Sequence, residues 1–475
     1  MSTTTVSTAA DNTPNGRRLS RGADSRPAAP VRIVHLGVGN FFRAHQAWYT
    51  EHASDTADWG IAAFTGRSAA IAETLAPQEG LYTLVVQGAQ GNDYEVIGSL
   101  SAVHAAQDVA ALRGYLADPA VVIVTSTVTE AGYLRAPGGG ADLKDPALAV
   151  DVAALREDPA RAVVTTLPGK LVAGLLARRA ANDAAPITFV PCDNVSGNGE
   201  MVEAVLRETA RAVDPSLEEW IDDNCGFVTT MVDRITPRPT EADLAAVRND
   251  RGVDDPAVVV TEPFTEWVLS GEFTGGRPDW ESAGARFVED IDPFETRKLW
   301  LLNGSHSLMA YAATILGIDT VYDAIRDPRV RGWVEDWWDV AARHLPLPAE
   351  EIQGYRDALV ERYENPKIRH LLAQIAADGS QKLPIRIVPA LLADRAAGAM
   401  PTGAVRAVAA WVLHLRGLGA PVTDAYAAEV VPLAEGPLGE AVGRVLHRLG
   451  VDDAEVATAV LDEAETLTEL SHQPN

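Results

Sequence analysis

Four polar side chains are spaced so that they can face one cavity from a single helix. They are Glu295, Lys298, Asn303 and His306, in the run ETRKLWLLNGSHS at residues 295–307. At about 100° per residue of an α-helix they fall within an arc of roughly 140°. The remaining positions are apolar nearly all round, which predicts a buried helix. Desolvation lowers the pKa of a buried lysine toward values at which the neutral amine acts as a base. The alternative is a lysine that reaches solvent and a hydrogen-bonded core histidine.

This run resembles the signature of the mannitol dehydrogenase family, the polyol-specific long-chain dehydrogenases, whose pattern is K-x4-N-x2-H with LNGSH at its centre. Lys298, Asn303 and His306 match the pattern, and residues 302–306 read LNGSH. The resemblance implies that Lys298 is the general base, that Asn303 helps to form an oxyanion hole and that His306 binds the reacting oxygen. We expect Glu295, one turn before Lys298, to relay the proton to water.

A glycine turn lies between an apolar run at residues 31–36 and a polar-apolar stretch at residues 43–52. Strand, glycine turn and helix form the first unit of a dinucleotide-binding fold, in which the backbone approaches the pyrophosphate and helix N–H groups bind it. A tight turn without a ligand is the alternative. The string GVGNFFRAHQ resembles the family's GxGxFxRAHQ phosphate loop, in which an aromatic residue replaces the final glycine. The resemblance implies cofactor contacts for Gly37, Gly39, Phe41, Phe42 and Arg43.

The second predicted strand, at residues 59–65, leads to Gly66, Arg67 and Ser68. An acidic residue at this point favours NAD because it accepts the ribose hydroxyls. Arg67 and Ser68 could instead receive the 2′-phosphate of NADP. We expect NAD, as in most members of the family, and leave NADP open.

Further candidate residues follow the ends of predicted strands. The apolar run at residues 120–126 continues into TVTEAGY, which resembles the TVTEKGY string of family members that act on uronates and suggests Thr127 as a cofactor contact and Tyr133 as a substrate contact.

The stretch after residues 187–191 resembles the family's CDN-x3-NG motif, so Asn194 is expected in the oxyanion hole. A side-chain amide donates hydrogen bonds to an alkoxide without carrying charge. An Asx turn or a helix N-cap is the alternative for Asn194. Asp233, in a string similar to the family's MVDRIxP, is expected to line the site.

Two clusters of polar residues in the last third of the chain suggest a substrate clamp. They contain His370, Lys382 and Arg386, and a guanidinium offers a carboxylate two parallel hydrogen bonds. Composition alone favours a capping turn with solvated charges. However, DGSQKLPIR resembles the fructuronate and tagaturonate branch of the family, which implies a sugar acid as substrate. Tyr363 and Lys367 also fit the Tyr-x3-Lys spacing of short-chain dehydrogenases, but Pro366 interrupts the helix that they would have to share.

The chain has 475 residues, more than one hydrophobic core usually supports, which predicts two domains. We expect the fold class to be α/β. A disordered tail at residues 1–29 is followed by a Rossmann-type NAD-binding domain at residues 30–290. Helical periodicity replaces strand-like runs from residue 293, so an all-helical substrate-binding domain is expected at residues 291–475.

Composition limits the kinds of partner. A net charge of −26 argues against nucleic acids and anionic membranes. No apolar run reaches eighteen residues, so a membrane span is not expected. Two cysteines, Cys192 and Cys225, fit a reducing cytoplasm and argue against a zinc-dependent dehydrogenase. We expect no metal, a small-molecule substrate, and a monomer or homodimer.

Together these features predict a metal-independent, NAD-dependent dehydrogenase that interconverts a secondary alcohol and its ketone. D-Mannonate with D-fructuronate is the expected substrate pair, and D-mannitol with D-fructose is the alternative. A non-catalytic nucleotide-binding scaffold is the alternative from another class.

Overall fold

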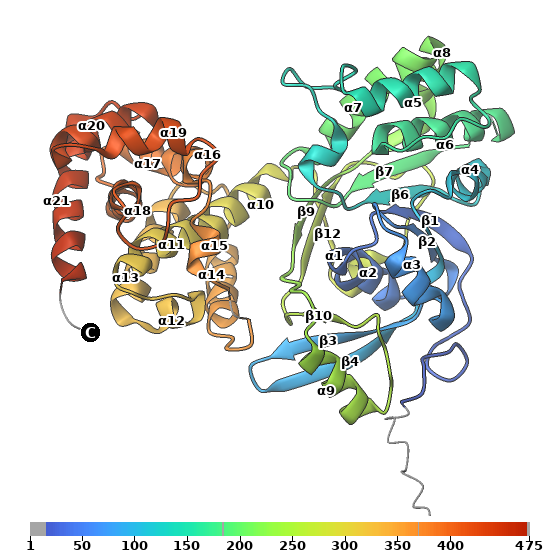
Figure 1. The fold of residues 1–475 in the computed structure, drawn as a ribbon, viewed down its shortest axis with the longest axis horizontal. Helices are drawn as coiled ribbons and strands as arrows, with labels where there is room; N and C mark the ends of the chain where they lie inside the picture. Colours follow the sequence, from blue (N-terminus) through green and yellow to red (C-terminus); the bar gives the residue numbers. More distant parts are fainter. Residues whose placement is uncertain (1–15, 183–184, 369, 473–475) are drawn as a thin grey trace, which may run out of the picture. The chain divides into compact units, whose positions relative to one another are not determined.

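The computed structural model describes residues 16–182, 185–368 and 370–472. The chain divides into two compact units. The first contains the described residues up to Gln87 together with Asn92–Glu289, and the second contains Gly88–Gly91 together with the described residues from Asp290 onward. Figure 1 shows strands and helices in the first unit and helices in the second. The predicted fold class, a Rossmann-type α/β part followed by a helical part, is confirmed.

A parallel sheet forms the centre of the first unit. Its order is β5-β2-β1-β6-β7-β8, and every neighbouring pair is parallel. The strands are β1 (Val31–Leu36), β2 (Gly60–Phe64), β5 (Leu100–His104), β6 (Ile123–Ser126), β7 (Ile187–Pro191) and β8 (Cys225–Phe227). The chain builds outward from β1 on one side and then restarts at β6 on the other. This change of direction between β1 and β6 is the topological switch point at which open α/β sheets bind their ligands.

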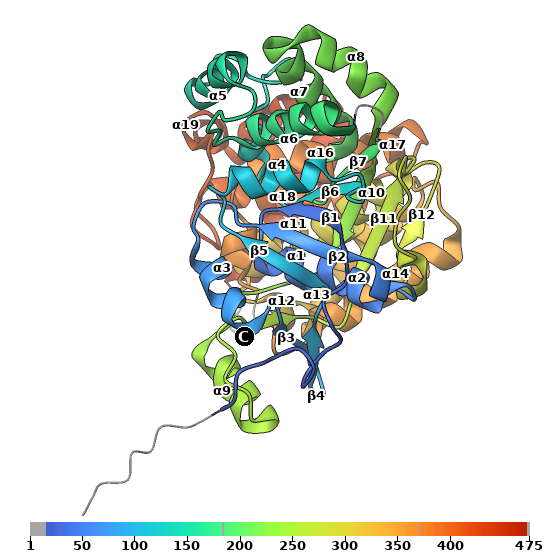
Figure 2. The ribbon, with the colours of Figure 1, turned by 90° about the vertical axis from the view of Figure 1, so that its right-hand side faces the viewer.

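Helices cover both faces of this sheet, as Figure 2 shows. Within β1, Val34 and Leu36 belong to one core and Ile33 to the other, because successive strand side chains point to opposite faces. The first core lies against α4 (Val109–Ala117), α5 (Pro146–Glu157), α6 (Leu167–Asn182), α7 (Asn198–Val213) and α8 (Pro215–Asn224). The second lies against α1 (Asn40–Ala44) and α2 (Gln46–His52). Burial on both faces explains why the strands are apolar runs and not alternating patterns.

Two three-stranded sheets complete the first unit. One has the order β10-β3-β4, and the other has the order β12-β11-β9. Their strands are β3 (Tyr82–Gly88), β4 (Gly91–Ile97), β9 (Thr229–Asp233), β10 (Val259–Thr261), β11 (Glu266–Ser270) and β12 (Arg286–Phe287), and the remaining α-helices of the unit are α3 (Ala70–Leu75) and α9 (Glu241–Arg251).

The second unit is built on α11 (Ser305–Ile315), a helix buried along almost its whole length. It packs against α13 (Pro328–Ala342), α15 (Leu372–Ile375) and α18 (Thr402–Leu415). The other helices are α10 (Asp292–Arg297), α12 (Val321–Arg326), α14 (Ala349–Tyr363), α16 (Gly379–Arg386), α17 (Val388–Ala396), α19 (Ala427–Val430), α20 (Leu438–Arg448) and α21 (Ala454–Ser471).

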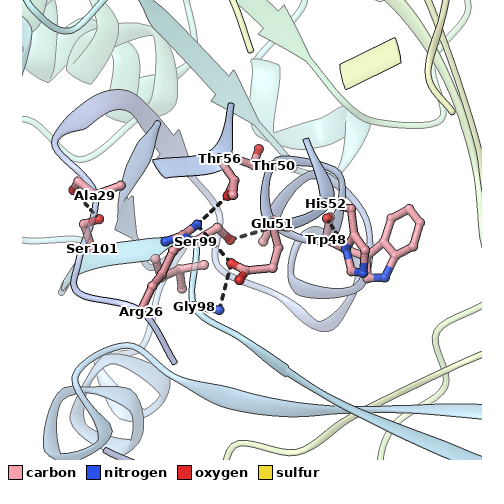
Figure 3. A network of polar contacts seen from close by, with 12 residues as sticks. Arg26, Ala29, Trp48, Thr50, Glu51, His52, Thr56, Gly98, Ser99 and Ser101 are labelled. Atoms are coloured by element: carbon pink, nitrogen blue, oxygen red, sulfur yellow. Dashed lines mark hydrogen bonds and ion pairs between the residues drawn. The ribbon is translucent and has the colours of Figure 1, made fainter. Parts of the chain in front are cut away.

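Residues 16–29 are packed against the first unit, so the prediction of a disordered tail over residues 1–29 is wrong for this part; residues 1–15 lie outside the described residues. Leu19 is 1% exposed and joins a small apolar core. Arg21 donates to the carbonyls of Gly98 and Leu100 at 3.0 and 2.7 Å. Figure 3 shows Arg26 paired with Glu51, whose carboxylate also accepts from the Gly98 N–H. The polar composition of this segment gave no sign of these contacts, because its arginines bind main-chain oxygens and one half-buried carboxylate.

Among the described helices, none combines the length and apolarity needed to cross a bilayer.

Candidate functional site

The run that carries Lys298, Asn303 and His306 is not a continuous α-helix. Between α10 and α11 the chain forms a π-helix, η5 (Lys298–Gly304). In a π-helix each N–H bonds to the carbonyl five residues back, so residues five apart come close to stacking. Lys298 and Asn303 are five apart, and in an α-helix they would lie about 140° from each other. The π-helix thus aligns them better than the predicted α-helix does.

Side chains from neighbouring helices bind the carbonyls of this π-helix. Trp337 Nε1 donates to the Trp300 carbonyl at 2.8 Å, and Trp338 Nε1 donates to the Leu301 carbonyl at 2.9 Å. The next two carbonyls accept as well: Tyr363 OH donates to Leu302 at 3.3 Å, and Arg386 Nη1 donates to Asn303 at 3.4 Å. Four successive carbonyls therefore have side-chain donors from three other helices, α13, α14 and α16.

The Gly-Ser pair of the LNGSH run has a structural explanation. A β-carbon on Gly304 would lie 2.7 Å from Trp337 Nε1, so only glycine fits beside this indole. Ser305 Oγ donates to the Leu301 carbonyl at 2.6 Å and lies 2.8 Å from Tyr363 OH. These two residues fit the π-helix to its neighbours.

The polar residues predicted on this run differ in burial. His306 is 7% exposed, and its ring centroid lies 5.0 Å from that of Tyr363 and 5.3 Å from that of His370. Glu295, Lys298 and Asn303 are half-buried, so the prediction of a fully buried helix is corrected at its start. The buried cation here is Arg297, which is 1% exposed, pairs with Glu351 at 3.2 Å and stacks on Tyr355. The salt bridge to Glu351 of α14 explains why the Arg297 side chain is buried.

Arg386 lies beside the π-helix and the start of α11. Its Nη1 donates to Ser307 Oγ at 3.2 Å in addition to the Asn303 carbonyl. Its Nε is buried without a hydrogen-bond partner, and no carboxylate among the described residues forms an ion pair with it. Burial lowers the pKa of Arg386, and burial likewise lowers the pKa of His370. The second unit therefore brings a guanidinium without an acidic partner close to the residues that follow Asn303.

The rest of the DGSQKLPIR segment is structural. Lys382 Nζ donates to the carbonyls of Ile375 and Ala377 at 3.1 and 2.5 Å, so it caps the end of α15. Ser380 binds Asp424 through both its N–H and its hydroxyl. The predicted clamp thus loses Lys382, because main-chain carbonyls occupy its ammonium, whereas His370 and Arg386 stay predictions. Tyr363 ends α14 and Lys367 lies outside it, which agrees with the rejection of the Tyr-x3-Lys motif.

In the first unit, Gly37 and Thr127 meet at the switch point. Gly37 has φ +110°, and a β-carbon there would lie 2.2 Å from the Thr127 carbonyl oxygen. Gly39 precedes α1, and no atom beyond its own turn lies within 4 Å of a β-carbon placed on it. Thr127 Oγ1 is buried and has no hydrogen-bond partner among the described residues. An open glycine turn beside an unsatisfied hydroxyl fits a dinucleotide at this edge.

Of the predicted cofactor contacts around this turn, Phe42 and Arg43 are corrected because they are buried, whereas Phe41 stays a prediction. Phe42 is completely buried, with its ring stacked 3.4 Å from that of His35. Arg43 is 4% exposed and donates to the Ala257 carbonyl and to Asn40 Oδ1 at 2.5 and 2.8 Å. Phe41 is half-buried and stacks on His45. The FxRAHQ part of the loop therefore anchors α1 from the inside, whereas Gly37 and Gly39 form the open turn.

Arg67 and Ser68 are exposed at the end of β2. Ser68 Oγ accepts from the Ala70 N–H at 3.1 Å, and the Arg67 carbonyl accepts from Gln107. The Arg67 guanidinium has no ion pair among the described side chains, so it remains available to a ligand.

Asn194 is exposed on a loop that two buried residues, Asp193 and Tyr133, hold in place. Asp193 accepts from the Val195 N–H, from Asn198 Nδ2 and from Tyr133 OH. Burial raises the pKa of Asp193, opposed by the hydrogen bond from Tyr133. Asn194 is not an N-cap, because α7 begins at Asn198 with Gly197 before it.

Tyr133 is 1% exposed, so the prediction that it contacts substrate is corrected: its hydroxyl supports the loop of Asn194 from inside. Asp233 ends β9 and is 6% exposed. Asn194 and Asp233 belong to the first unit and Lys298 belongs to the second, so their proximity stays a prediction.

Sequence reasoning missed Ser307, Trp337, Trp338 and Tyr363. The adjacent residues Trp337 and Trp338 gave no sign in the sequence that both indoles donate to carbonyls of the distant π-helix. Among the described residues, no group of three or more His, Cys, Asp or Glu side chains could hold a metal ion.

A parallel sheet with a glycine turn at its switch point, followed by a helical unit with a lysine, an asparagine and a histidine in register, defines a dinucleotide-dependent dehydrogenase. Two family models match the chain: the mannitol dehydrogenase Rossmann domain over residues 31–282 and the mannitol dehydrogenase C-terminal domain over residues 290–432. The chain therefore belongs to the mannitol dehydrogenase family and is an oxidoreductase.

Relatives act on different substrates. The chain is 38% identical over 397 residues to D-mannonate oxidoreductase of Escherichia coli K12, covering 82% of this chain and 80% of that protein. It is also 38% identical over 384 residues to D-arabinitol 4-dehydrogenase of Ralstonia nicotianae, with 78% and 80% covered. The structure of Pseudomonas fluorescens mannitol 2-dehydrogenase with NAD and D-mannitol matches at a TM-score of 0.72 and 32% identity, over 94% of this chain and 92% of that one. Identity alone does not choose among these substrates.

Proposed function

We propose that this protein is an NAD-dependent dehydrogenase of a sugar acid and that it interconverts D-mannonate and D-fructuronate. The observation that carries the proposal is Arg386, a half-buried guanidinium with no acidic partner among the described residues, bonded to Asn303 of the π-helix and to Ser307 on the helix of His306. A substrate carboxylate would supply the missing counter-charge and accept from its free N–H groups. The 38% identity to D-mannonate oxidoreductase of Escherichia coli supports the same substrate.

The chemistry follows from the residue types. In the oxidising direction the neutral amine of Lys298 takes the hydroxyl proton, while the hydrogen on the same carbon leaves as hydride and the C–O bond becomes a carbonyl. When bound, NAD supplies the hydride acceptor. Asn194 and Asn303 donate to the alkoxide, His306 orients the same oxygen, and Glu295 relays the proton to water.

The cofactor is assigned to the switch point of the first unit. Gly37 and Gly39 leave the backbone open to a pyrophosphate, and the unsatisfied hydroxyl of Thr127 provides a donor. The ternary complex of the Pseudomonas fluorescens relative contains NAD, which supports the choice of cofactor. Arg67 and Ser68 keep NADP as the second possibility, because an exposed guanidinium at the end of β2 suits a 2′-phosphate.

The second candidate substrate pair is D-mannitol with D-fructose, favoured by the relative whose structure contains D-mannitol. An uncharged polyol leaves Arg386 without a counter-charge, which is why we prefer the acid. We further propose a cytoplasmic location, since both cysteines are free thiols. A monomer or homodimer is part of the same proposal.

The test is a comparison of D-fructuronate and D-fructose as substrates, with NADH and NADPH each in turn. We expect kcat/KM to be highest with D-fructuronate and NADH. Arg386→Ala should lower kcat/KM for the acid by roughly tenfold to a hundredfold more than for D-fructose, the range for a lost charge-assisted hydrogen bond, since loss of its contact to the Asn303 carbonyl affects both substrates alike.

Lys382→Ala is the matched control, because it removes a cation from the same helix whose amine already binds two main-chain carbonyls. Its effect should be equal for both substrates. Equal losses for the two substrates in Arg386→Ala, or a preference of the native protein for D-fructose, would overturn the assignment to a sugar acid.

A further inference from the structure

The hydroxyl of Tyr363 occupies a central place in the second unit. It lies 2.8 Å from Ser305 Oγ and donates to the Leu302 carbonyl at 3.3 Å, while its ring packs against that of His306 with 5.0 Å between centroids. Tyr363 is 3% exposed. A single buried side chain therefore contacts the end of the π-helix, the first residue of α11 and the proposed oxygen-binding imidazole.

A π-helix needs such contacts because it is less favourable than the α-helix on either side of it. It is rare and mostly confined to single turns, where neighbouring groups stabilise the wider ring. Here the donors come from Trp337, Trp338, Tyr363, Ser305 and Arg386. The first two are indoles fixed in the core, and Arg386 faces the proposed substrate. The Tyr363–Ser305 pair is the part of this set that can be removed by deleting one oxygen atom.

We propose that Tyr363 is a positioning residue for the dehydrogenase reaction, and that with Ser305 it holds the π-helix that aligns Lys298 with Asn303 and His306. The inference rests on the proposed role of Lys298 as the base. If the segment relaxed to α-helical geometry, residues 298 and 303 would turn apart toward the 140° of an α-helix. Tyr363 then acts through Lys298 and not on the substrate.

The experiment compares Tyr363→Phe, Ser305→Ala and their combination with the native protein. The phenylalanine keeps the ring contact to His306 and removes only the hydroxyl. We expect each single variant to lose roughly tenfold to a hundredfold in kcat, the cost of misplacing a reacting group. The affinity for NAD, measured by titration, should be unchanged. The double variant should lose less than the product of the two single losses, because both changes break the same Ser305–Tyr363 hydrogen bond.

Thr314→Ala is the matched control. Thr314 lies on the same helix α11, and its hydroxyl also donates to a carbonyl four residues back, at 2.7 Å, but away from the π-helix. It should lower the melting temperature, as the loss of a hydroxyl-to-carbonyl hydrogen bond does, while keeping native kcat. The isotope effect for substrate deuterated at the reacting carbon should rise in Tyr363→Phe and Ser305→Ala and remain native in Thr314→Ala, because misalignment slows the chemical step.

Retention of more than half of the native kcat in Tyr363→Phe, or a kcat loss in Thr314→Ala equal to that in Ser305→Ala, would overturn the inference. Failure of the proposed function is seen separately. Full activity in Lys298→Ala would show that Lys298 is not the general base, whatever the result for Tyr363→Phe. An inactive Lys298→Ala together with a fully active Tyr363→Phe would leave the base in place and reject only the positioning role.

Discussion

Gly304 and Trp337 are in contact so close that no other residue fits at position 304: a β-carbon there would lie 2.7 Å from Nε1 of the indole and 2.8 Å from its Cζ2. The same Nε1 donates to the Trp300 carbonyl. The glycine of the LNGSH run is thus explained by the partner that holds the π-helix, and not by a need for unusual backbone angles.

Gly304→Ala should destabilise the protein by about 1–3 kcal/mol, the usual cost of overpacking a core, and should reduce kcat because Trp337 is displaced from the π-helix. Gly332→Ala is the control. Gly332 lies on α13, the helix of Trp337, with nothing within 4 Å of a β-carbon, so alanine should be neutral or stabilise by up to about 1 kcal/mol. Denaturant unfolding measures both. A Gly304→Ala protein as stable as Gly332→Ala would contradict the packing argument.

Lys298→Ala should abolish turnover while NAD affinity remains close to native, since the proposed base lies in the second unit and the glycine turn in the first. Lys144→Ala, at an exposed lysine of the first unit, should be fully active. Initial rates and NAD titration distinguish the two effects. Lost NAD affinity with retained turnover would count against Lys298 as the base.

Thr127→Val should have opposite effects on stability and on cofactor binding. The valine removes a buried hydroxyl that has no partner among the described residues, so the protein without NAD should keep or slightly raise its melting temperature. The dissociation constant for NAD should rise by roughly fivefold to tenfold, as for one lost hydrogen bond. Unchanged NAD affinity in a stable variant would show that this hydroxyl does not bind the cofactor.

The stability of the protein should fall in mild acid because of His414. Burial lowers the pKa of His414 from 6.5 to about 4. The unfolded chain therefore binds a proton more tightly than the folded protein does, so the free energy of unfolding decreases as the pH falls from about 6.5 toward 4.

The variant that tests this is His414→Phe, whose ring can keep the contact to Tyr311 at a site 2% exposed. Denaturant unfolding at pH 7 and at pH 4.5 should show a smaller difference between the two pH values than in the native protein. His35 contributes to the same dependence, since burial lowers its pKa to about 3. An identical pH difference with and without His414 would exclude this imidazole as a source.

The sequence predicted the parts of the fold that local patterns control. Residues 31–36 and 187–191 were expected as strands and form β1 and β7, because runs of buried aliphatic residues leave few alternatives. The π-helix could not be predicted, since side chains 37 to 83 positions away bind four of its carbonyls. Lys298 and Arg297 show the same limit: these adjacent cations differ in burial, since Lys298 is half-buried whereas Arg297 is 1% exposed, paired with Glu351 and stacked on Tyr355.

The same distinction between local properties and contacts to distant residues applies to the predicted site residues. Gly37 was predicted from the turn that it makes, which is a local property. Phe42 and Arg43 belong to the same loop, yet they face inward because His35 and the Ala257 carbonyl receive them. A motif therefore marks residues that matter together, without separating those that touch a ligand from those that hold the loop.

Residues 16–29 bear on how the protein should be produced. A recombinant version trimmed to the start of β1 would lose the guanidinium that binds Gly98 and Leu100 and the one paired with Glu51, and it would uncover the apolar cluster that Leu19 seals. Purification tags and cleavage sites are better attached ahead of residue 16 than fused directly to the first strand.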